Sequence, residues 1–524
     1  MDIKLLLAPV FCVLTKNVGE YENFPNISLA SLKAYINGHY QSQVIDLNAR
    51  LLKNNHDLFH QLYLFDETRY RPLQYLNKEQ VKQLEYFNFS DLPDLSLLLS
   101  LTGEDIGYKK ISSIDFLGLN DDQARELVDQ IDQETEKDLQ QVSQDCHIFA
   151  LSIFQSNIYY AACLAKKLKK KNKDNVVIFG GPSLAYLPLV KLLLKLGICD
   201  YIILGEGEKS FLQILDYLLK GQGSLPGVKN LAYKNDGEVL INEGCDYIEN
   251  LDLLPEPDYS DYDLSFLQKT GTPVAFSRGC PYQCSFCSAA NFWPAFRTMS
   301  VSRSIEIIKQ YVEEKQIKKF FIFNPTVNVS EKWLNDLCLE LIKADLQIDW
   351  SGSFRAQNLS QETIANLKKS GCNYVDLAIE NVDQKILDKM NKGITVRKAV
   401  AVIADLLHAG IKLRLHLIVG FPGEKWHNFL KNLNFLKSFL QKVPAGSYYN
   451  FYISELFIDT NSAIFKKPDQ YGIKIRKLDI NPTVDLPFKK ELQDLNIKWF
   501  IDNEYRDQTY LKVKLMNKLK QGKN

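Results

Sequence analysis

Short apolar runs alternate with stretches of helical periodicity over residues 1–225. This alternation is typical of an α/β unit with a parallel sheet, because buried parallel strands are apolar on both faces whereas the helices that cover them are apolar on one. Between about 50 and 145 a polar, largely helical insertion interrupts the pattern. The apolar runs predict five strands, at Ile3–Val10, Gln43–Asp46, Ile148–Ile153, Val176–Phe179 and Tyr201–Leu204.

A second series of strands follows a segment with the composition of a linker. Residues 226–270 lack a regular pattern, and proline and aspartate are concentrated at 253–262, as is common between domains. Residues 271–445 then show apolar runs joined by helical stretches, which fit a partial (β/α)6 barrel, and we expect 446–524 to be a mixed C-terminal region that shapes the substrate site. The predicted barrel strands are Val274–Ser277, Lys319–Phe323, Ile348–Ser351, Tyr374–Ile379, Lys412–Val419 and Ser447–Ile453.

The composition narrows the class of protein. With 46% hydrophobic and 24% charged residues, the chain has the make-up of a soluble globular protein. Lys plus Arg (63) equals Asp plus Glu (63), so no net charge favours a nucleic-acid partner. The N-terminus has no signal-peptide pattern, and no apolar run approaches the ~20 residues of a membrane span. Ten scattered cysteines do not form a secreted disulfide framework, so we expect a cytoplasmic protein.

Three of the cysteines, Cys280, Cys284 and Cys287, lie in one loop directly after the first predicted barrel strand. Barrel active sites gather at this end of the strands, and thiolates favour iron–sulfur clusters or zinc. A zinc site needs a fourth ligand, yet the next Cys or His in the sequence is Cys338, and Cys245 lies across the linker. Three thiolates on a four-iron cluster leave one iron open, which distinguishes a reactive metal centre from a structural one.

The C-x3-C-x2-C spacing, with the aromatic Phe286 before the last cysteine, resembles the hallmark of the radical S-adenosylmethionine (SAM) superfamily. The resemblance implies a [4Fe–4S] cluster on the three cysteines, with its free iron chelated by the amino and carboxylate groups of SAM. It also implies that one electron from the cluster cleaves SAM to a 5′-deoxyadenosyl radical, and that a flavodoxin or ferredoxin supplies that electron. Structural zinc is the alternative.

The same resemblance implies SAM contacts at other strand ends. Asn324 begins an Asn-Pro-Thr turn, where the family more often has a Gly-Gly-Glu-like turn that binds the methionine amine. Arg355 would pair with the SAM carboxylate, with a surface ion pair as the alternative. Glu380 would hold the ribose hydroxyls, unless it caps its strand in a salt bridge. Gly420, within Leu417–Glu424, would let adenine lie against the loop.

Two predicted strands of the first unit each end in a glycine-containing loop. Both loops are therefore expected at the sheet edge where nucleotides and related ligands bind. The first βα turn lacks a G-x-G-x-x-G fingerprint, which makes NAD improbable. Together with Ala150–Ser156 and the linker, the pattern resembles the Rossmann-like cobalamin-binding domain found ahead of many radical SAM barrels. Plain turns in a domain that has lost its cofactor are the alternative. The residues that the resemblance places around the corrin are Ser152, Gln155, Ser156, Gly180, Gly181, Gly205 and Gly207.

The segment Asp145–Ala150 imitates the D-x-H-x-x-G motif that supplies an axial histidine to cobalt in the mutases. That motif belongs after the first strand and ends in glycine. Here His147 opens a later strand and alanine replaces the glycine. We therefore interpret His147 as structural, and the resemblance then implies that cobalamin binds without a histidine ligand.

The paired domains support one main hypothesis and several alternatives. The adenosyl radical would abstract hydrogen from an unactivated carbon, and the substrate radical would take a methyl group from methylcobalamin, which a second SAM regenerates. The same cofactors would serve a rearrangement or cyclisation without methylation. A methylthiotransferase would need a second cysteine triad, and a non-catalytic corrinoid- or zinc-binding protein is the remaining reading. No motif identifies the substrate as a small molecule, lipid or peptide, or identifies further catalytic residues.

Overall fold

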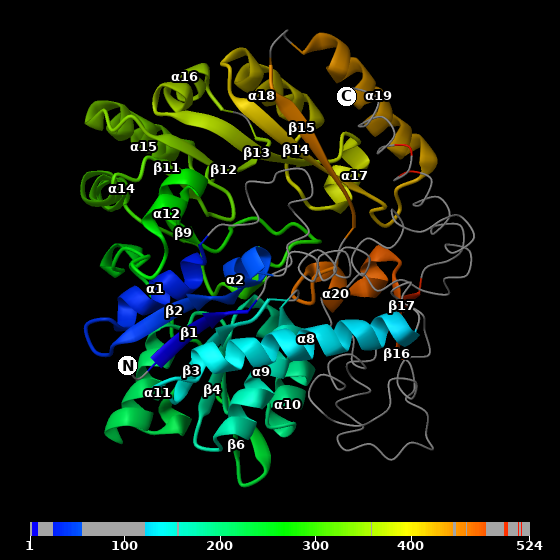
Figure 1. Cartoon of the computed structure of the whole chain (residues 1–524). Coiled ribbons are helices and arrows are strands. Elements are labelled where there is room, and N and C mark those ends of the chain that lie inside the picture. The colour runs from blue at the N-terminus through cyan, green and yellow to red at the C-terminus, as the bar shows by residue number, and fades with distance from the viewer. Residues whose placement is uncertain are drawn as a thin grey trace.

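The described residues form two α/β units (Figure 1). The structure is a computed structural model. It describes residues 3–8, 25–54, 121–154, 157–357, 359–443, 447–456, 458–477 and 497–500, together with Lys512 and Leu515.

The first unit is built on a sheet with the strand order β2-β1-β3-β4-β5-β6-β7. The first five strands are parallel, which confirms the five strands expected from the sequence. The order 2-1-3-4-5 places the switch point between β1 and β3, where open parallel sheets bind ligands. The parallel strands are β1 (Ile3–Leu7), β2 (Ser42–Asp46), β3 (Ile148–Ser152), β4 (Val176–Gly180) and β5 (Tyr201–Ile203).

Two antiparallel strands extend this sheet. β6 (Leu231–Asn235) pairs with β5, and β7 (Glu238–Ile241) pairs with β6. Both lie within residues 226–270, which were expected to be irregular. The rest of that segment packs on the first unit: Lys33 of α1 (Ile27–Ile36) forms an ion pair with Asp261 at 2.6 Å. The expected linker is therefore partly strand and partly an anchored connection.

Helices cover both faces of the first sheet. Alternate strand residues point to opposite faces, so β1 buries Leu5 under one layer of helices and Leu6 under the other. One layer contains α1 and α11 (Glu208–Lys220). The second layer contains α2 (Leu47–Asn54), α8 (Asp121–Val142), α9 (Ile158–Lys171) and α10 (Leu187–Lys195).

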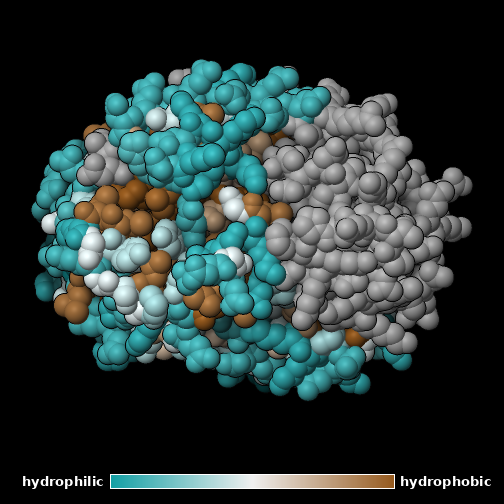
Figure 2. All heavy atoms as spheres, turned by 90° about the horizontal axis from the view of Figure 1, so that it is seen from below, coloured by the Kyte–Doolittle hydropathy of each residue, from teal (hydrophilic) through white to brown (hydrophobic). Residues whose placement is uncertain are grey.

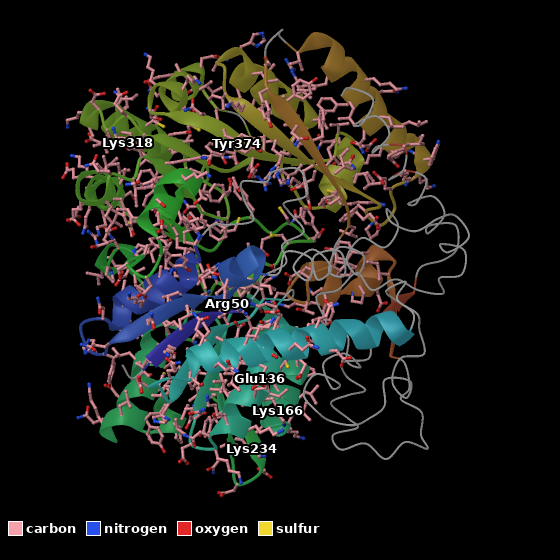
Figure 3. The ribbon with its side chains drawn as sticks, in the orientation of Figure 1. Arg50, Glu136, Lys166, Lys234, Lys318 and Tyr374 are labelled. Carbon is pink, nitrogen blue, oxygen red and sulfur yellow. The ribbon has the colours of Figure 1, made fainter. Side chains whose placement is uncertain are left out.

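Helix α8 is the longest described part of the predicted insertion. The Tyr160 hydroxyl of α9 donates to Asp138 Oδ2 of α8 at 2.5 Å. Arg50 of α2, which is labelled in Figure 3, pairs with the same Asp138 carboxylate. Burial raises the pKa of Asp138 to about 6. These buried polar contacts make α8 part of the core of the first unit.

The second unit is a partial barrel with the strand order β15-β14-β13-β12-β11-β8. All neighbouring pairs are parallel, which confirms the expected six-stranded architecture. The strands are β8 (Thr272–Val274), β11 (Lys319–Ile322), β12 (Asp349–Arg355), β13 (Cys372–Glu380), β14 (Lys412–Val419) and β15 (Tyr449–Glu455).

Four of the helices that connect these strands start at hydroxyl caps. The side chains of Ser300, Ser330, Ser360 and Thr395 each accept a hydrogen bond from the backbone N–H three residues further on, which satisfies one of the unpaired donors at a helix start. The barrel helices are α14 (Val301–Lys315), α15 (Glu331–Ala344), α16 (Gln361–Lys369), α17 (Gln384–Lys389), α18 (Val396–His408) and α19 (Trp426–Lys442).

The carboxyl ends of the two sheets face each other. Glu206 follows β5, Arg278 follows β8, and Arg278 Nη1 donates to Glu206 Oε2 at 2.6 Å. A second bridge is made by the short helix α20 (Ala463–Lys466), where the Phe465 ring packs edge-on against Tyr186 of the first unit at 5.8 Å between centroids. The ligand-binding edges of both units therefore border one region.

None of the helices in the part of the chain that the structure describes combines the length and the apolar character needed to cross a membrane. Among the residues that Figure 2 colours by hydropathy, hydrophilic ones predominate and apolar patches lie between them. Exposed large apolar side chains of the first unit include Leu187, Leu219 and Leu240. Scattered residues of this kind are normal on protein surfaces, and we assign no function to them.

Candidate active site

The cysteine cluster lies in a loop whose neck is a two-stranded ribbon. β9 (Ser277–Arg278) pairs antiparallel with β10 (Arg297–Thr298), so residues 279–296 leave and return at the carboxyl edge of the barrel. Gly279 turns the chain with φ of +78°, and a Cβ at this position would lie 2.7 Å from the Ala295 carbonyl oxygen. Only glycine fits this close approach of two backbone segments.

The three thiols share one environment. Burial raises the pKa of Cys280, and it raises the pKa of Cys287 to about 11; neighbouring cysteines add to both increases. Lys392 acts in the opposite direction on both thiols, and Arg355 does so on Cys280. The sulfur atoms therefore lie close enough to interact electrostatically, and two cations face them.

The surroundings of the thiols bear on the two kinds of metal site expected from the sequence. Among the described residues, no three His, Cys, Asp or Glu side chains form a site for one metal ion. Three soft donors faced by cations fit an anionic iron–sulfur cluster better than a closed zinc site, which needs a fourth ligand.

Arg355 lies directly beside the cysteines. At the end of β12 the residue is 5% exposed, and its Nη1 lies 3.4 Å from Cys284 Sγ. The guanidinium stacks on Tyr282 at 3.9 Å from the ring centroid. No carboxylate of the described residues pairs with it, so it is not the surface ion pair considered as an alternative. A buried cation of this kind favours an anionic ligand.

Glu380 and Lys392 form a buried pair next to the cysteine loop. Lys392 Nζ donates to Glu380 Oε1 at 3.0 Å, and the two residues are 4% and 7% exposed. The Lys392 ammonium lies 5.9 Å from the centroid of the Phe286 ring. Glu380 has φ of +65°, a conformation that is uncommon outside glycine and concentrated at functional sites. The salt bridge exists, and ribose binding by Glu380 stays a prediction.

The Asn-Pro-Thr turn organises the neighbouring strand ends. Asn324 Oδ1 accepts hydrogen bonds from the backbone N–H of Phe276 at 2.9 Å and of Ser277 at 3.1 Å. Thr326 Oγ1 accepts one from the Arg355 N–H at 3.1 Å. The turn thus ties the entry of the cysteine loop to Arg355. Contact of Asn324 with the methionine amine stays a prediction.

Gly420 belongs to a buried network that the sequence reasoning missed in part. Its N–H donates to Glu424 Oε2 at 2.8 Å, while Glu424 Oε1 accepts from Asn381 at 3.1 Å and from Asn432 at 3.4 Å. Lys512 lies 3.3 Å from Glu424 Oε2 and is 1% exposed. Burial raises the pKa of Glu424. The network holds in place the loop that is predicted to contact adenine. No local pattern in the sequence predicts that Lys512 joins this network.

A second missed feature binds the neck of the cysteine loop to the first unit. Glu206 is 3% exposed, and its carboxylate accepts hydrogen bonds from both Arg278 of β9 and Arg297 of β10. Glu208 pairs with Arg278 as well. These acidic residues stand in the glycine loop whose glycines alone had been singled out.

The glycines of that loop have different roles in the backbone. Gly205 has φ of +89°, which favours glycine, whereas Gly207 precedes α11 with φ of −103°. Their predicted contact with a corrin stays a prediction. In the structure, the turn between Gly205 and Gly207 places Glu206 next to the barrel.

The other predicted corrin contacts lie at the carboxyl ends of β3 and β4. Ser152 and Gly180 are partners in the register of these strands. Asn157 is fully buried, and its Nδ2 donates to the carbonyl of Ser152 at 2.9 Å and to that of Ala8 at 3.3 Å. Asn157 therefore connects the ends of β1 and β3, the two strands on either side of the switch point. This role was not predicted from the sequence. Gln155 and Ser156 lie outside the described residues.

His147 lies at the opposite edge of the sheet. It precedes β3 and is exposed, and its Nδ1 lies 3.3 Å from Asn175 Oδ1. The amino end of β3 points away from the ligand-binding edge. This position agrees with the interpretation of His147 as a structural residue.

Gly181→Ala is expected to destabilise the first unit by about 2–4 kcal/mol. Gly181 has φ of +122°, and a Cβ there would overlap the Ile153 carbonyl and lie 2.8 Å from the Ile153 nitrogen. Gly180→Ala is the matched control, because its Cβ would meet no atom within 4 Å. Thermal unfolding followed by circular dichroism should show a midpoint about 5–10 °C lower for Gly181→Ala alone. Equal midpoints for the two variants would contradict this assignment.

Comparison with known proteins places the barrel in a family. Residues 274–436 match the model of the radical SAM superfamily. An uncharacterized methyltransferase of Pyrococcus horikoshii is 30% identical over 298 residues, 56% of this chain and 64% of that protein. The anaerobic magnesium-protoporphyrin IX monomethyl ester cyclase of Rubrivivax gelatinosus is 28% identical over 277 residues, 51% of this chain and 50% of that protein. The chain thus spans less than two thirds of the length of both relatives.

Two solved structures resemble the fold as a whole. TsrM from Kitasatospora setae, a radical SAM methyltransferase determined with cobalamin and a [4Fe–4S] cluster, has a TM-score of 0.62 at 11% identity, over 97% of this chain and 87% of TsrM. The cobalamin-dependent radical SAM enzyme OxsB, with aqua-cobalamin and SAM bound, has a TM-score of 0.62 at 16% identity, over 97% of this chain and 66% of OxsB. The likeness confirms the expected fold, a Rossmann-like unit followed by a partial barrel.

Proposed function

Residues 274–436 are a radical SAM domain, and on this premise we propose that the chain is an enzyme that cleaves SAM reductively and transfers a methyl group with the help of cobalamin. The observation that carries the proposal is the position of the buried Arg355 guanidinium, 3.4 Å from Cys284 in the three-cysteine loop. A cation without a carboxylate partner among the described residues, beside three thiols, suits an anionic cluster and an anionic cosubstrate.

Cys280, Cys284 and Cys287 would hold the cluster. When bound, such a cluster would supply the one electron that cleaves the sulfonium of SAM to methionine and a 5′-deoxyadenosyl radical. Arg355 would bind the SAM carboxylate, and Tyr282 keeps the guanidinium in place by stacking on it. Lys392 neutralises Glu380, which leaves the second carboxylate oxygen to accept from ribose hydroxyls.

The first unit would bind cobalamin. Its 2-1-3-4-5 strand order and its glycine turns at the carboxyl edge support this assignment, as does its likeness in fold to proteins determined with cobalamin bound. Cobalamin supplies a carrier for the methyl group. The corrin contacts proposed at Ser152, Gly180 and Gly181 lie at the edge that faces the barrel.

Methyl transfer to an unactivated carbon is the favoured reaction, and cyclisation without methylation is the second candidate. The methyltransferase from Pyrococcus horikoshii supports the first, and the cyclase from Rubrivivax gelatinosus supports the second. Methylthiolation is disfavoured because Cys146, Cys163 and Cys199 are separate buried residues of the first unit and share no loop: Cys163 lies on α9, Cys146 precedes β3 and Cys199 precedes β5. Cys12 lies outside the described residues.

The products distinguish these reactions. The protein is reconstituted anaerobically with iron and sulfide, loaded with hydroxocobalamin, and given methyl-deuterated SAM, dithionite and an extract of the cells that encode it. Methyl transfer predicts 5′-deoxyadenosine, S-adenosylhomocysteine and a deuteromethylated product. Formation of 5′-deoxyadenosine without the other two would contradict methyl transfer and favour cyclisation. A protein that forms no 5′-deoxyadenosine would contradict the radical function itself.

Arg355→Lys is expected to weaken SAM binding about 10- to 100-fold. Lysine keeps the positive charge but loses the planar pair of donors and the stacking on Tyr282. Arg397→Lys is the matched control, because Arg397 is exposed on α18. Anaerobic equilibrium dialysis with radiolabelled SAM measures the dissociation constant. An unchanged constant for Arg355→Lys would remove this residue from the SAM site.

A further inference from the structure

The register of the barrel strands brings four residues to one level of its inner face. Arg355 pairs with Ala378, Ala378 with His416, and His416 with Tyr452. In parallel strands, residues paired in this way point to the same face. We call these four residues the upper row. Because Arg355 reaches Cys284 from this row, the row lies at the level of the cysteine loop.

The opposite face of the same strands is the outer one. The Trp350 indole of β12 donates to the carbonyl of Ser370, just beyond α16, at 3.1 Å. Leu413, Leu415 and Leu417 alternate with the inner residues of β14 and are buried in the apolar core. The helices therefore cover this apolar face, and the upper row belongs to the inner face.

A second row of inner residues lies one step below the first and is polar throughout. We define this lower row as Ser353, Asp376, Arg414 and Asn450, which are paired in the strand register. Arg414 donates from Nε to Asp376 Oδ1 and from Nη2 to Asp376 Oδ2, both at 2.6 Å. Asp376 and Arg414 are each 5% exposed. Their charges compensate each other, so this row is polar but close to neutral.

His416 is the member of the upper row whose ring reaches toward the lower row. Its Nε2 is buried, has no hydrogen-bond partner among the described residues and lies 3.7 Å from Asp376 Oδ1. The ring packs against Tyr452 at 5.0 Å between centroids, and the side chain is 21% exposed. A buried polar atom without a partner needs an explanation. With the Nε2 proton turned toward Asp376, the other ring nitrogen, Nδ1, carries a lone pair for a ligand.

We propose that His416 binds the substrate of the radical reaction by accepting a hydrogen bond at Nδ1. This inference rests on the proposed function and deepens it. Two carboxylates on the strand next to His416 are paired, Asp376 with Arg414 and Glu380 with Lys392. An unpaired carboxylate that would attract an amine is therefore absent from the two rows. The substrate is accordingly a molecule that presents a neutral hydrogen-bond donor, a hydroxyl or an amide N–H, to the barrel. A purely hydrocarbon surface would not supply this donor.

The position of His416 gives this hydrogen bond its role. His416 shares the upper row with Arg355, two strands away, and Arg355 adjoins the cysteines. A donor group held by His416 fixes the neighbouring carbon atoms of the substrate at the level where the adenosyl radical forms. His416 is a substrate-positioning residue in this account, and the hydrogen-atom transfer itself needs no proton from it.

The test uses His416→Ala, His416→Asn and His408→Ala in the reconstituted full-length protein. Asparagine places an acceptor oxygen near the position of Nδ1, and His408 is an exposed histidine at the end of α18. The probe is an extract of the encoding cells, and the measured quantity is the ratio of 5′-deoxyadenosine formation with and without extract. We expect His416→Ala to lower this ratio at least about tenfold, the effect of a lost hydrogen bond of about 1.4 kcal/mol. His416→Asn should retain most of it, and His408→Ala should match the wild type.

Several results would overturn the inference. His416→Ala that responds to the extract like the wild type would remove His416 from the substrate site, and His416→Asn that fails as His416→Ala does would show that only ring packing matters. A reaction product that contains neither a hydroxyl nor an amide would also count against the inference. So would an extract that leaves the wild-type rate of 5′-deoxyadenosine formation unchanged. In all these cases the wild type still cleaves SAM. Loss of that cleavage in the wild type would instead refute the proposed function and the inference with it.

Discussion

Replacing Cys284 by alanine is expected to abolish cluster assembly and SAM cleavage. A four-iron cluster that already lacks a fourth protein ligand is left with two thiolates, too few to hold it. Cys284 is also the thiol that Arg355 approaches, so the same change removes the partner of that cation. Iron and sulfide bound after anaerobic reconstitution should fall to background, together with the visible charge-transfer absorption and the formation of 5′-deoxyadenosine.

Cys245→Ala serves as the control for this variant. Cys245 is also partly buried and lies outside the triad, so its loss should leave iron content and SAM cleavage at wild-type levels. A Cys284→Ala protein that still binds four irons and cleaves SAM would contradict the assignment of the three ligands. A colourless wild-type protein that takes up zinc and no iron would favour the structural-zinc alternative.

Glu206→Ala is expected to destabilise the protein by about 3–5 kcal/mol, the second large effect. The change leaves Arg297, at the neck of the cysteine loop, without a carboxylate partner among the described residues, and it leaves Arg278 with Glu208 alone. An uncompensated buried charge is costly. Because Arg278 directly precedes Gly279 and Cys280, cluster assembly should weaken as well. The thermal unfolding midpoint of the full-length protein should fall by about 10 °C, and the iron content after reconstitution should fall with it.

The matched change Glu238→Ala removes a carboxylate from an exposed position on β7. Surface substitutions of this kind usually alter stability by less than about 0.5 kcal/mol. A Glu206→Ala midpoint no lower than that of Glu238→Ala would show that Glu206 does not support the neck of the loop. Retention of stability with loss of iron would instead limit its role to the cysteine loop.

Local patterns in the sequence predicted much of the fold. The parallel strands of both units are continuous apolar runs, for example the five buried residues of β3, and such runs stand out from amphipathic helices. β7 has no such run, because its residues alternate between exposed and half-buried positions at the sheet edge. The proline and aspartate residues at 253–262 indicated a linker. The predicted linker extended too far toward the N-terminus, so that it included β6 and β7.

The candidate site was predictable where its residues are close in sequence. Cys280, Cys284 and Cys287 follow a spacing that fits one loop, and Arg355 ends a recognisable strand. By contrast, the arginine partners of Glu206 lie more than seventy residues away along the chain, and the alignment of His416 with Arg355 depends on the register of two strand pairs. Sequence periodicity gives the face on which a strand residue lies but not its level relative to other strands, so these relations required the structure.

The electron paramagnetic resonance spectrum of the reconstituted, dithionite-reduced protein, recorded with and without SAM, tests most directly whether Cys280, Cys284 and Cys287 hold a cluster with an open iron. The account predicts the signal of a reduced four-iron cluster whose g values change when SAM is added, because SAM then binds the iron that no cysteine occupies. A protein without this signal, or a spectrum that SAM leaves unchanged, would contradict the account.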